Sequence, residues 1–335
     1  MKEALFYEKI DAKVKCGLCN HRCSIPQSKK GICGVRQNKD GMLYSLVYGR
    51  PVAQHIDPIE KKPLYHFYPG SYAYSIATVG CNFKCKNCQN ADISQMPVDS
   101  NRIIGDKVTP ERIVKLAKQY NCSSIAYTYT EPVIFYEYAY DISRLASDEG
   151  IKNIFITNGY ITEEALREIS PYLDAANIDL KSFSDDFYRK NCGARLKPVL
   201  DSIELHKELG IWIEVTTLVI PTLNDSSDEL RHIAEFIKSV GEEIPWHVSA
   251  FYPTYRLRNI ERTPTKTLRK AREIGLKAGL RYVYTGNILG DVGEHTYCYK
   301  CGTSLIRRYG FEIMENRIKD SKCPDCGAKI DIVEV

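Results

Sequence analysis

The sequence lacks a hydrophobic run long enough to cross a membrane. No stretch approaches the roughly 18 apolar residues that a transmembrane helix needs, and the opening MKEALFYEKI is too charged for a secretory signal. Hydrophobic residues make up 44% and charged residues 26% of the 335 residues, a composition typical of a soluble globular protein. We therefore expect a cytoplasmic protein with no membrane partner.

A second absence concerns dinucleotide cofactors. No G-x-G-x-x-G segment follows the first expected strand, which argues against a dinucleotide-binding fold. Short β-rich runs instead alternate with helical ones as far as residue 285. The expected strands are 74–79, 123–129, 152–157, 174–179, 211–220, 246–251 and 281–285, and the expected helices are 110–120, 132–150, 162–170, 198–210, 226–239 and 265–279. About six βα units in a row predict an α/β fold with a partial or complete TIM-like parallel barrel.

Cysteine, by contrast, is abundant, and 11 of the 13 cysteines fall into three groups. In a reducing cytosol, close Cys-x2-Cys pairs are typical of metal ligands rather than disulfides, and so many soft ligands suit anaerobic conditions. The groups are Cys16, Cys19, Cys23 and Cys33; Cys81, Cys85 and Cys88; and Cys298, Cys301, Cys323 and Cys326. We interpret the two others, Cys122 and Cys192, as ordinary buried cysteines.

The middle group leaves one coordination position open. Its three cysteines lie in VGCNFKCKNCQN, directly after the first expected strand, with C-x3-C-x2-C spacing. Three thiolates can hold three irons of a 4Fe–4S cubane and leave the fourth iron free for a substrate or cofactor. Zinc is the alternative, because His55, His66 or His247 could complete a zinc site.

Polar side chains follow the next expected strands. They are Glu131, Thr157, Asn158, Asp179 and Lys181, and His247 opens the sixth strand. Any one of them could cap a helix or face solvent. Because the carboxyl ends of parallel barrel strands meet on one face, we expect these residues to surround the cysteine triplet in an active site.

These features resemble the radical S-adenosylmethionine (SAM) superfamily, whose signature is C-x3-C-x2-C after a first barrel strand. Residues 70–285 resemble its pyruvate formate-lyase activating enzyme branch through GCNFKCKNCQN, YTEP, ITNGY, NIDLKSF and TTLVIPTLND. The whole chain, including EKKPLYHFYPGS and the N-terminal cysteines, is most similar to the radical enzymes of the AmmeMemoRadiSam system.

The resemblance implies a 4Fe–4S cluster on Cys81, Cys85 and Cys88, with SAM bound to its open iron. Glu131 would receive the amino group of SAM. The implied reaction is one-electron cleavage of SAM to a deoxyadenosyl radical, which abstracts hydrogen from the substrate. Ferredoxin or flavodoxin would donate the electron.

Five further residues have implied roles around the cofactor. Lys181 and His247 would face the SAM carboxylate. Thr157, Asn158 and Asp179 would line the floor of the site near the ribose or a small cation.

Two positions depart from the family pattern. Asn87 precedes the last cysteine, where an aromatic residue usually packs on adenine, and Phe83 is the alternative for that contact. Tyr129 and Thr130 replace a pair of glycines before Glu131, so we expect their side chains to reshape the pocket near the methionine.

The flanking cysteine groups predict two small metal-binding modules. The C-terminal pairs have the spacing of a zinc ribbon. The less regular N-terminal quartet favours structural zinc, with an auxiliary iron–sulfur cluster as the alternative. We therefore expect a four-cysteine module in residues 1–65, a radical SAM barrel in 66–290 and a zinc-ribbon-like module in 291–335.

The leading hypothesis is a radical SAM enzyme that modifies or activates a partner protein. The alternative is a redox-sensing or RNA-binding metal-cluster scaffold without turnover. Lys and Arg outnumber Asp and Glu in residues 1–65, but a solvated basic surface explains this more simply, and we do not expect nucleic acid as a partner.

Overall fold

An eight-stranded sheet forms the centre of the computed structural model, which describes residues 1–11 and 13–334. Its strand order is β14-β13-β12-β11-β10-β9-β8-β7. Neighbouring strands from β8 to β14 are parallel, and β7 pairs antiparallel with β8 at one edge. The strands are β7 (Ala53–Pro58), β8 (Tyr72–Ala77), β9 (Ser124–Tyr127), β10 (Lys152–Thr157), β11 (Ala175–Asp179), β12 (Trp212–Val219), β13 (Trp246–Ala250) and β14 (Val283–Gly286).

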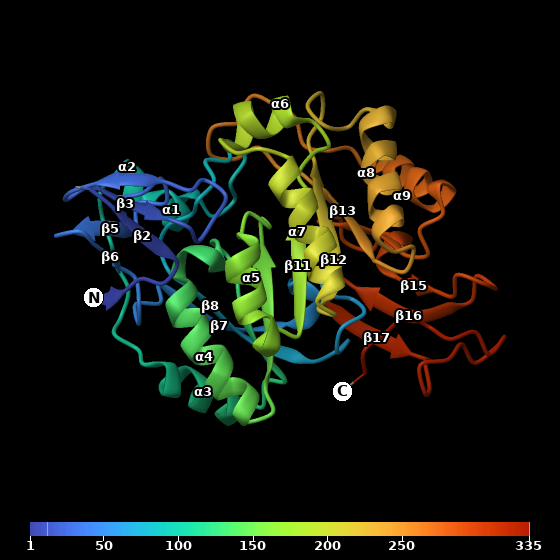
Figure 1. The fold of residues 1–335 in the computed structure, drawn as a ribbon. Coiled ribbons are helices and arrows are strands. Elements are labelled where there is room, and N and C mark those ends of the chain that lie inside the picture. Colours follow the sequence, from blue (N-terminus) through green and yellow to red (C-terminus); the bar gives the residue numbers. More distant parts are fainter. Residues whose placement is uncertain (12, 335) are drawn as a thin grey trace.

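Helices connect these strands and cover the outside of the curved sheet (Figure 1). The longer ones are α3 (Pro110–Gln119), α4 (Tyr136–Asp148), α5 (Glu163–Ile169), α7 (Lys197–Glu208), α8 (Ser227–Val240) and α9 (Thr265–Ala278). Shorter turns are η1 (Ile59–Lys61), α1 (Ala91–Ser94), α2 (Met96–Asp99), η2 (Pro132–Phe135), η3 (Ser170–Tyr172), α6 (Asp185–Phe187), η4 (Tyr188–Cys192) and η5 (Val292–Glu294).

Capping residues in the sequence explain where two of these helices begin. Thr109 accepts a hydrogen bond from the backbone N–H of Arg112, and Pro110 occupies the first turn of α3. Ser226 caps α8 in the same way.

The alternation of strands and helices confirms the predicted α/β barrel. Because β14 and β7 end the strand order without pairing, the barrel is partial.

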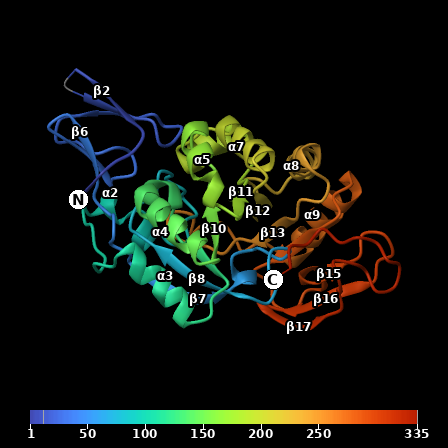
Figure 2. The ribbon, with the colours of Figure 1, turned by 60° about the horizontal axis from the view of Figure 1, so that its bottom comes forward.

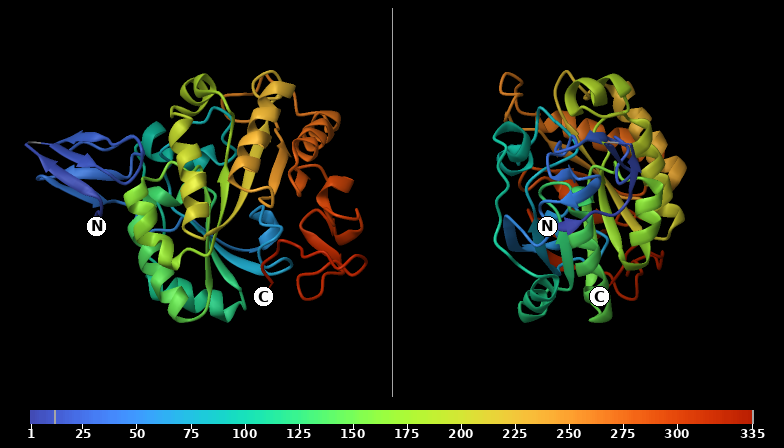
Figure 3. Two further views of the ribbon diagram at one scale, coloured as in Figure 1. Left: turned by 45° about the vertical axis from the view of Figure 1, so that its right-hand side comes forward. Right: turned by 60° about the vertical axis from the view of Figure 1, so that its left-hand side comes forward.

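The N-terminal segment forms two three-stranded antiparallel sheets that project from one side of the barrel (Figure 3). One contains β1 (Lys2–Glu3), β6 (Met42–Ser45) and β5 (Arg36–Lys39), and the other β2 (Tyr7–Ile10), β3 (Lys13–Cys16) and β4 (Ser24–Pro26). The barrel sheet already begins within residues 1–65, because β7 pairs with β8. The module boundary expected at residue 65 stays a prediction.

The C-terminal segment forms a third small sheet from β15 (Thr296–Tyr297), β16 (Ser304–Tyr309) and β17 (Glu312–Asn316). It packs beside the amino-terminal ends of the barrel strands. Arg308 Nη2 donates to the carbonyl of Tyr65 (2.9 Å), and Arg281, just before β14, pairs with Asp331 (2.8 Å). The two small modules therefore lie at different ends of the barrel (Figure 2).

No helix within residues 1–11 and 13–334 is both long enough and apolar enough to traverse a bilayer.

A buried ion pair joins the N-terminal module to α4. The Arg36 guanidinium donates to both carboxylate oxygens of Glu137 (2.7 and 3.1 Å), and both side chains are almost completely buried. Removing one partner of such a pair leaves an uncompensated buried charge, which costs about 3–5 kcal/mol.

We predict that Glu137→Ala lowers the free energy of unfolding by about 3–5 kcal/mol, measured by urea unfolding followed by circular dichroism. Glu163→Ala is the matched control, because its ion pair with Arg167 is exposed to solvent and should contribute little to stability. Equal losses in the two variants would show that the buried pair does not fix the module to the barrel.

Candidate active site

The cysteine triplet lies on the loop that follows β8, at the carboxyl end of the barrel. The backbone N–H of Phe83 donates to Cys81 Sγ (3.3 Å), and Cys88 Sγ lies 3.2 Å from Ser94 Oγ. Burial raises the pKa of the Cys81 thiol well above its usual range, and the charges of Glu131 and Cys85 add to the shift. The loop therefore gathers its thiols beside the carboxylate of Glu131.

Glu131 is connected to this loop by a chain of hydrogen bonds. One carboxylate oxygen accepts from Thr157 Oγ1 (2.7 Å), and the other accepts from the backbone N–H of Asn158 (2.8 Å). The Asn158 side chain in turn donates to Asn82 Oδ1 (2.8 Å), directly after Cys81. Glu131 is only 2% exposed, and burial raises its pKa to about 7, although these hydrogen bonds oppose the shift.

Lys181 and Asp179 occupy the end of β11 and form an ion pair (2.7 Å). Burial lowers the pKa of Lys181, but the negative charges of Asp179, Cys85 and Cys192 outweigh it and hold the pKa well above the usual range. The lysine is thus a cation that faces the cysteine loop, with Asp179 beside it.

The structure corrects the expectation for Phe83. Its ring is 1% exposed and packs edge-on against Tyr160 and Tyr188, with centroid distances of 5.1 and 6.2 Å. Phe83 therefore belongs to the core and is not free to pack on adenine. The Asn87 side chain accepts a hydrogen bond from Asn191 (2.8 Å), so it fixes the loop to η4.

Tyr129 is one of the two residues that we expect to reshape the pocket near the methionine, and its side chain lies against Asp57 and His55 of β7. It adopts the left-handed conformation with φ of 61°, which costs a residue other than glycine roughly 1–2 kcal/mol. Its hydroxyl donates to Asp57, and Lys62 Nζ lies 4.4 Å from the ring centroid. These contacts fix the ring against β7 and the segment that follows it.

His247 lies in a separate buried cluster. Its Nε2 atom is 2.6 Å from Glu214 Oε2, and its ring stacks on Tyr284 with centroids 5.2 Å apart. The other Glu214 oxygen accepts from the backbone N–H of His66 (2.8 Å). Because Glu214 and His247 lie near the starts of β12 and β13, the structure places His247 apart from the cofactor residues and corrects that expectation.

Comparisons with known proteins place this site in a family. Residues 75–237 match the family described as the radical SAM superfamily. An uncharacterized protein of Methanocaldococcus jannaschii is 48% identical over 337 residues, which cover 99% of this chain and 100% of that protein. The chain belongs to the radical SAM superfamily.

Two further comparisons describe relatives of this radical SAM protein. The pyruvate formate-lyase-activating enzyme of Clostridium pasteurianum is 26% identical over 215 residues, which cover 59% of this chain and 87% of that enzyme. A radical SAM methyltransferase from Sphaerobacter thermophilus has a similar fold, with a TM-score of 0.51, 14% identity, and coverage of 70% of this chain and 71% of that chain.

Family membership implies a 4Fe–4S cluster and SAM, and the donors at the site fit both. The loop supplies three thiols, which can hold three irons and leave one open. Glu131 supplies a buried carboxylate and Lys181 a partly buried ammonium, one group of each charge, as the amino and carboxylate groups of SAM require. The chain is therefore an enzyme of the radical SAM class.

Cys192, expected from the sequence to be an ordinary buried cysteine, lies beside the cysteine loop of this radical SAM site. Its thiol lowers the pKa of the Cys85 thiol, and its carbonyl accepts from the backbone N–H of Lys84 (2.7 Å). The carbonyl of Asn191 accepts likewise from Lys86 (3.0 Å). Because η4 lies far along the chain from the cysteine loop, no local pattern could reveal this pairing.

The C-terminal cysteines converge on one point. The Sγ atoms of Cys298, Cys301, Cys323 and Cys326 all lie within 4.8 Å of one another. Cys298 and Cys326 are 3.7 Å apart, as are Cys301 and Cys323. Four sulfurs bound tetrahedrally at a Zn–S distance of about 2.3 Å would be about 3.8 Å apart, so this group has the dimensions of a single-ion site.

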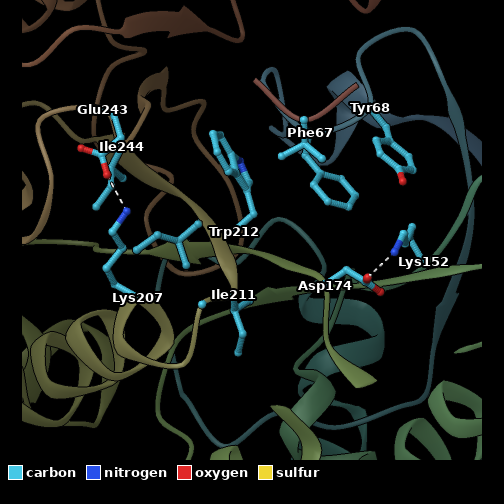
Figure 4. A pocket seen from close by; sticks show the side chains of 12 residues that line it. Phe67, Tyr68, Lys152, Asp174, Lys207, Ile211, Trp212, Glu243 and Ile244 are labelled. Atoms are coloured by element: carbon cyan, nitrogen blue, oxygen red, sulfur yellow. Dashed lines mark hydrogen bonds and ion pairs between the residues drawn. The ribbon is translucent and has the colours of Figure 1, made fainter. Parts of the chain in front are cut away.

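A cavity of about 340 Å³ lies at the opposite end of the barrel (Figure 4). Trp212, Lys152 and Asp174 line it, and the last two form an ion pair (2.8 Å). These residues lie at the starts of β12, β10 and β11, so the cavity is not part of the cysteine site.

We predict that the anaerobically reconstituted protein has a reduced EPR spectrum that changes when SAM is added. Cys85→Ser should abolish the SAM-dependent change, because the cluster loses one of only three protein ligands. Cys122→Ser, also a buried cysteine but remote from the loop, should retain it. A SAM-dependent change that persists when Cys81, Cys85 and Cys88 are all serine would show that the cluster lies elsewhere.

Proposed function

We propose that this radical SAM enzyme is of the activating-enzyme type and modifies or activates a partner protein. The observation that carries the proposal is the hydrogen-bonded chain from Glu131 through Asn158 and Asn82 to the cysteine loop. It holds a buried carboxylate in a fixed position beside the thiols that would bind the cluster.

The chain's own residues would hold and orient the cofactors. Cys81, Cys85 and Cys88 would ligate the cluster, which when bound supplies the one electron for reductive cleavage of SAM. Glu131 would accept hydrogen bonds from the amino group of SAM, and Lys181 would donate to its carboxylate.

Supporting residues keep these two charged groups in place. Thr157 and the backbone N–H of Asn158 bind the Glu131 carboxylate, while Asp179 holds the Lys181 ammonium. Their bonds limit the rotamers of both groups, so less entropy is lost when SAM binds.

A protein substrate is supported by one relative and by the form of the barrel. The Clostridium enzyme is named for the activation of pyruvate formate-lyase, which is itself a protein. The barrel edges β14 and β7 are not paired with each other, which is compatible with access for a polypeptide segment. Ferredoxin or flavodoxin would supply the electron.

We also propose that the C-terminal quartet holds one structural zinc ion. The sulfur separations of 3.7 Å support this assignment. Because the sheet β15-β16-β17 is too small for a large core, a metal crosslink would stabilise it.

The function is tested by anaerobic turnover with a chemical reductant, SAM and candidate partner proteins. We predict that the true partner raises the release of deoxyadenosine above the partner-free rate and changes in mass. Glu131→Gln should lose this activity while keeping its iron, because the glutamate binds SAM rather than the cluster. SAM binding without deoxyadenosine release under any condition would favour the scaffold without turnover.

We predict that SAM affinity depends on the ionisation of Glu131. With a pKa of about 7, the ionised fraction falls from about three quarters at pH 7.5 to about one tenth at pH 6. Protonation removes the negative charge that accepts hydrogen bonds from the amino group of SAM. The contribution of Glu131 alone should therefore lower the affinity for SAM by about eightfold between pH 7.5 and pH 6.

The control is Glu131→Gln, whose affinity should already be about tenfold or more weaker at pH 7.5. Any pH dependence of SAM affinity that remains in Glu131→Gln arises from other titrating groups. The difference between the pH profiles of the natural protein and this variant therefore gives the contribution of the Glu131 carboxylate. Identical pH profiles in anaerobic titrations would mean that Glu131 does not contact SAM.

A further inference from the structure

The four N-terminal cysteines line a common buried pocket. Cys16 and Cys33 are buried, and Cys19 and Cys23 are partly buried. Most of the other lining residues are apolar, including Leu18, Ile25, Val133 and Ile134. Four thiols around one apolar pocket form a closed set of soft ligands, typical of a bound metal centre.

The spacing of these thiols differs from that of a single-ion site. Among the residues that the structure describes, which include every cysteine, the C-terminal quartet alone brings three or more ligand atoms within 4.8 Å of one another. The thiols of the N-terminal quartet therefore do not meet this 4.8 Å criterion, and neither do those of Cys81, Cys85 and Cys88, which fit a 4Fe–4S cluster. A cubane separates its cysteine ligands more than one zinc ion does, because each thiolate binds a different iron.

Two buried hydrogen-bond donors in the pocket wall also lack partners. Arg36 Nε and Asn82 Nδ2 have no hydrogen-bond partner within the described part of the chain. Both residues line the pocket, and they are only 2% and 1% exposed. An unsatisfied buried N–H group costs about 1–3 kcal/mol, so such donors normally have a ligand to bind. The inorganic sulfides of a cluster are acceptors of this kind.

The pocket directly adjoins the loop of the radical site. The His21 ring nitrogen Nε2 lies 2.8 Å from the carbonyl oxygen of Asn82. A Cβ atom added to Gly80 would lie only 3.2 Å from the Cys33 carbonyl and 2.8 Å from the Val35 side chain. The backbone on both sides of Cys81 is therefore packed against the N-terminal module.

A buried cation lies in the same loop. Lys84 Nζ is inaccessible and has no hydrogen-bond partner among the described residues. A 4Fe–4S cluster with cysteine ligands is an anion, so the Lys84 ammonium would offset part of the charge of clusters on either side of the loop.

We propose that Cys16, Cys19, Cys23 and Cys33 bind a second 4Fe–4S cluster, beside the loop that carries the radical cluster. This assignment replaces the structural zinc that the sequence favoured for the quartet. It goes beyond the proposed function, because the radical reaction needs only the cluster of the triplet.

The test is metal analysis of the full-length protein after anaerobic reconstitution with iron, sulfide and zinc. We expect about eight irons and eight sulfides per chain, with about one zinc, and two cubane signals in the Mössbauer spectrum of ⁵⁷Fe-labelled protein. This first measurement needs no variant, so a folding defect cannot confuse it. About four irons with about two zincs per chain would overturn the proposal.

Variants then assign each metal to its cysteines. Cys19→Ser with Cys33→Ser should lower iron to about four per chain without loss of zinc, and it should retain the SAM-dependent EPR change. The matched control, Cys301→Ser with Cys326→Ser, should lose zinc and keep all its iron. Loss of zinc instead of iron from the first variant would contradict the proposal.

A third variant separates this proposal from the proposed function. Serine at Cys81, Cys85 and Cys88 should remove the SAM-dependent signal and leave about four irons on the N-terminal quartet. A protein without iron in this variant would overturn the second cluster but not the radical site.

Discussion

The site depends on satisfying one buried negative charge. Glu131 lies after β9, yet it is bound by donors from the end of β10, and Asn158 continues the chain to Asn82 in the loop after β8. Hydrogen bonds to a charged group contribute about 1.5–3 kcal/mol each, and an unpaired buried carboxylate would be far more costly. A single carboxylate thus fixes the carboxyl ends of three neighbouring strands before any cofactor binds.

The two cysteine-rich modules lie at different ends of the barrel and differ in what they contact. The N-terminal module packs against the cysteine loop through Gly80 and Asn82 and is joined to α4 by the Arg36–Glu137 pair. The C-terminal module packs at the amino-terminal ends of the strands, where Arg308 binds the carbonyl of Tyr65. Only the N-terminal module is therefore placed to affect the chemistry directly. The C-terminal one contacts the base of the barrel, away from the cysteine loop.

Much of the fold could be predicted from local sequence. The alternation of β-rich and helical runs predicted the order of the elements, and in the structure Thr109 and Ser226 cap α3 and α8 where two of the helical runs begin. The position of Glu131 and Lys181 beside the cysteine loop could also be predicted, because residues at the ends of parallel strands share one face of a barrel.

The direction of side chains could not be predicted in the same way. His247 faces Glu214, and Phe83 packs into the core, because partners remote in sequence determine both orientations. The contact of Cys192 with Cys85 depends on the turn η4, which has no distinctive local pattern. These contacts arise from tertiary packing, which neither motif spacing nor periodicity encodes.

We propose that the cysteine loop leaves one iron of the cluster open and that SAM binds to this iron beside Glu131. The most direct measurement is electron–nuclear double resonance of the reduced protein with SAM labelled with ¹⁵N at its amino group. We expect a hyperfine coupling between the labelled nitrogen and the cluster. Tight SAM binding without any such coupling would contradict it.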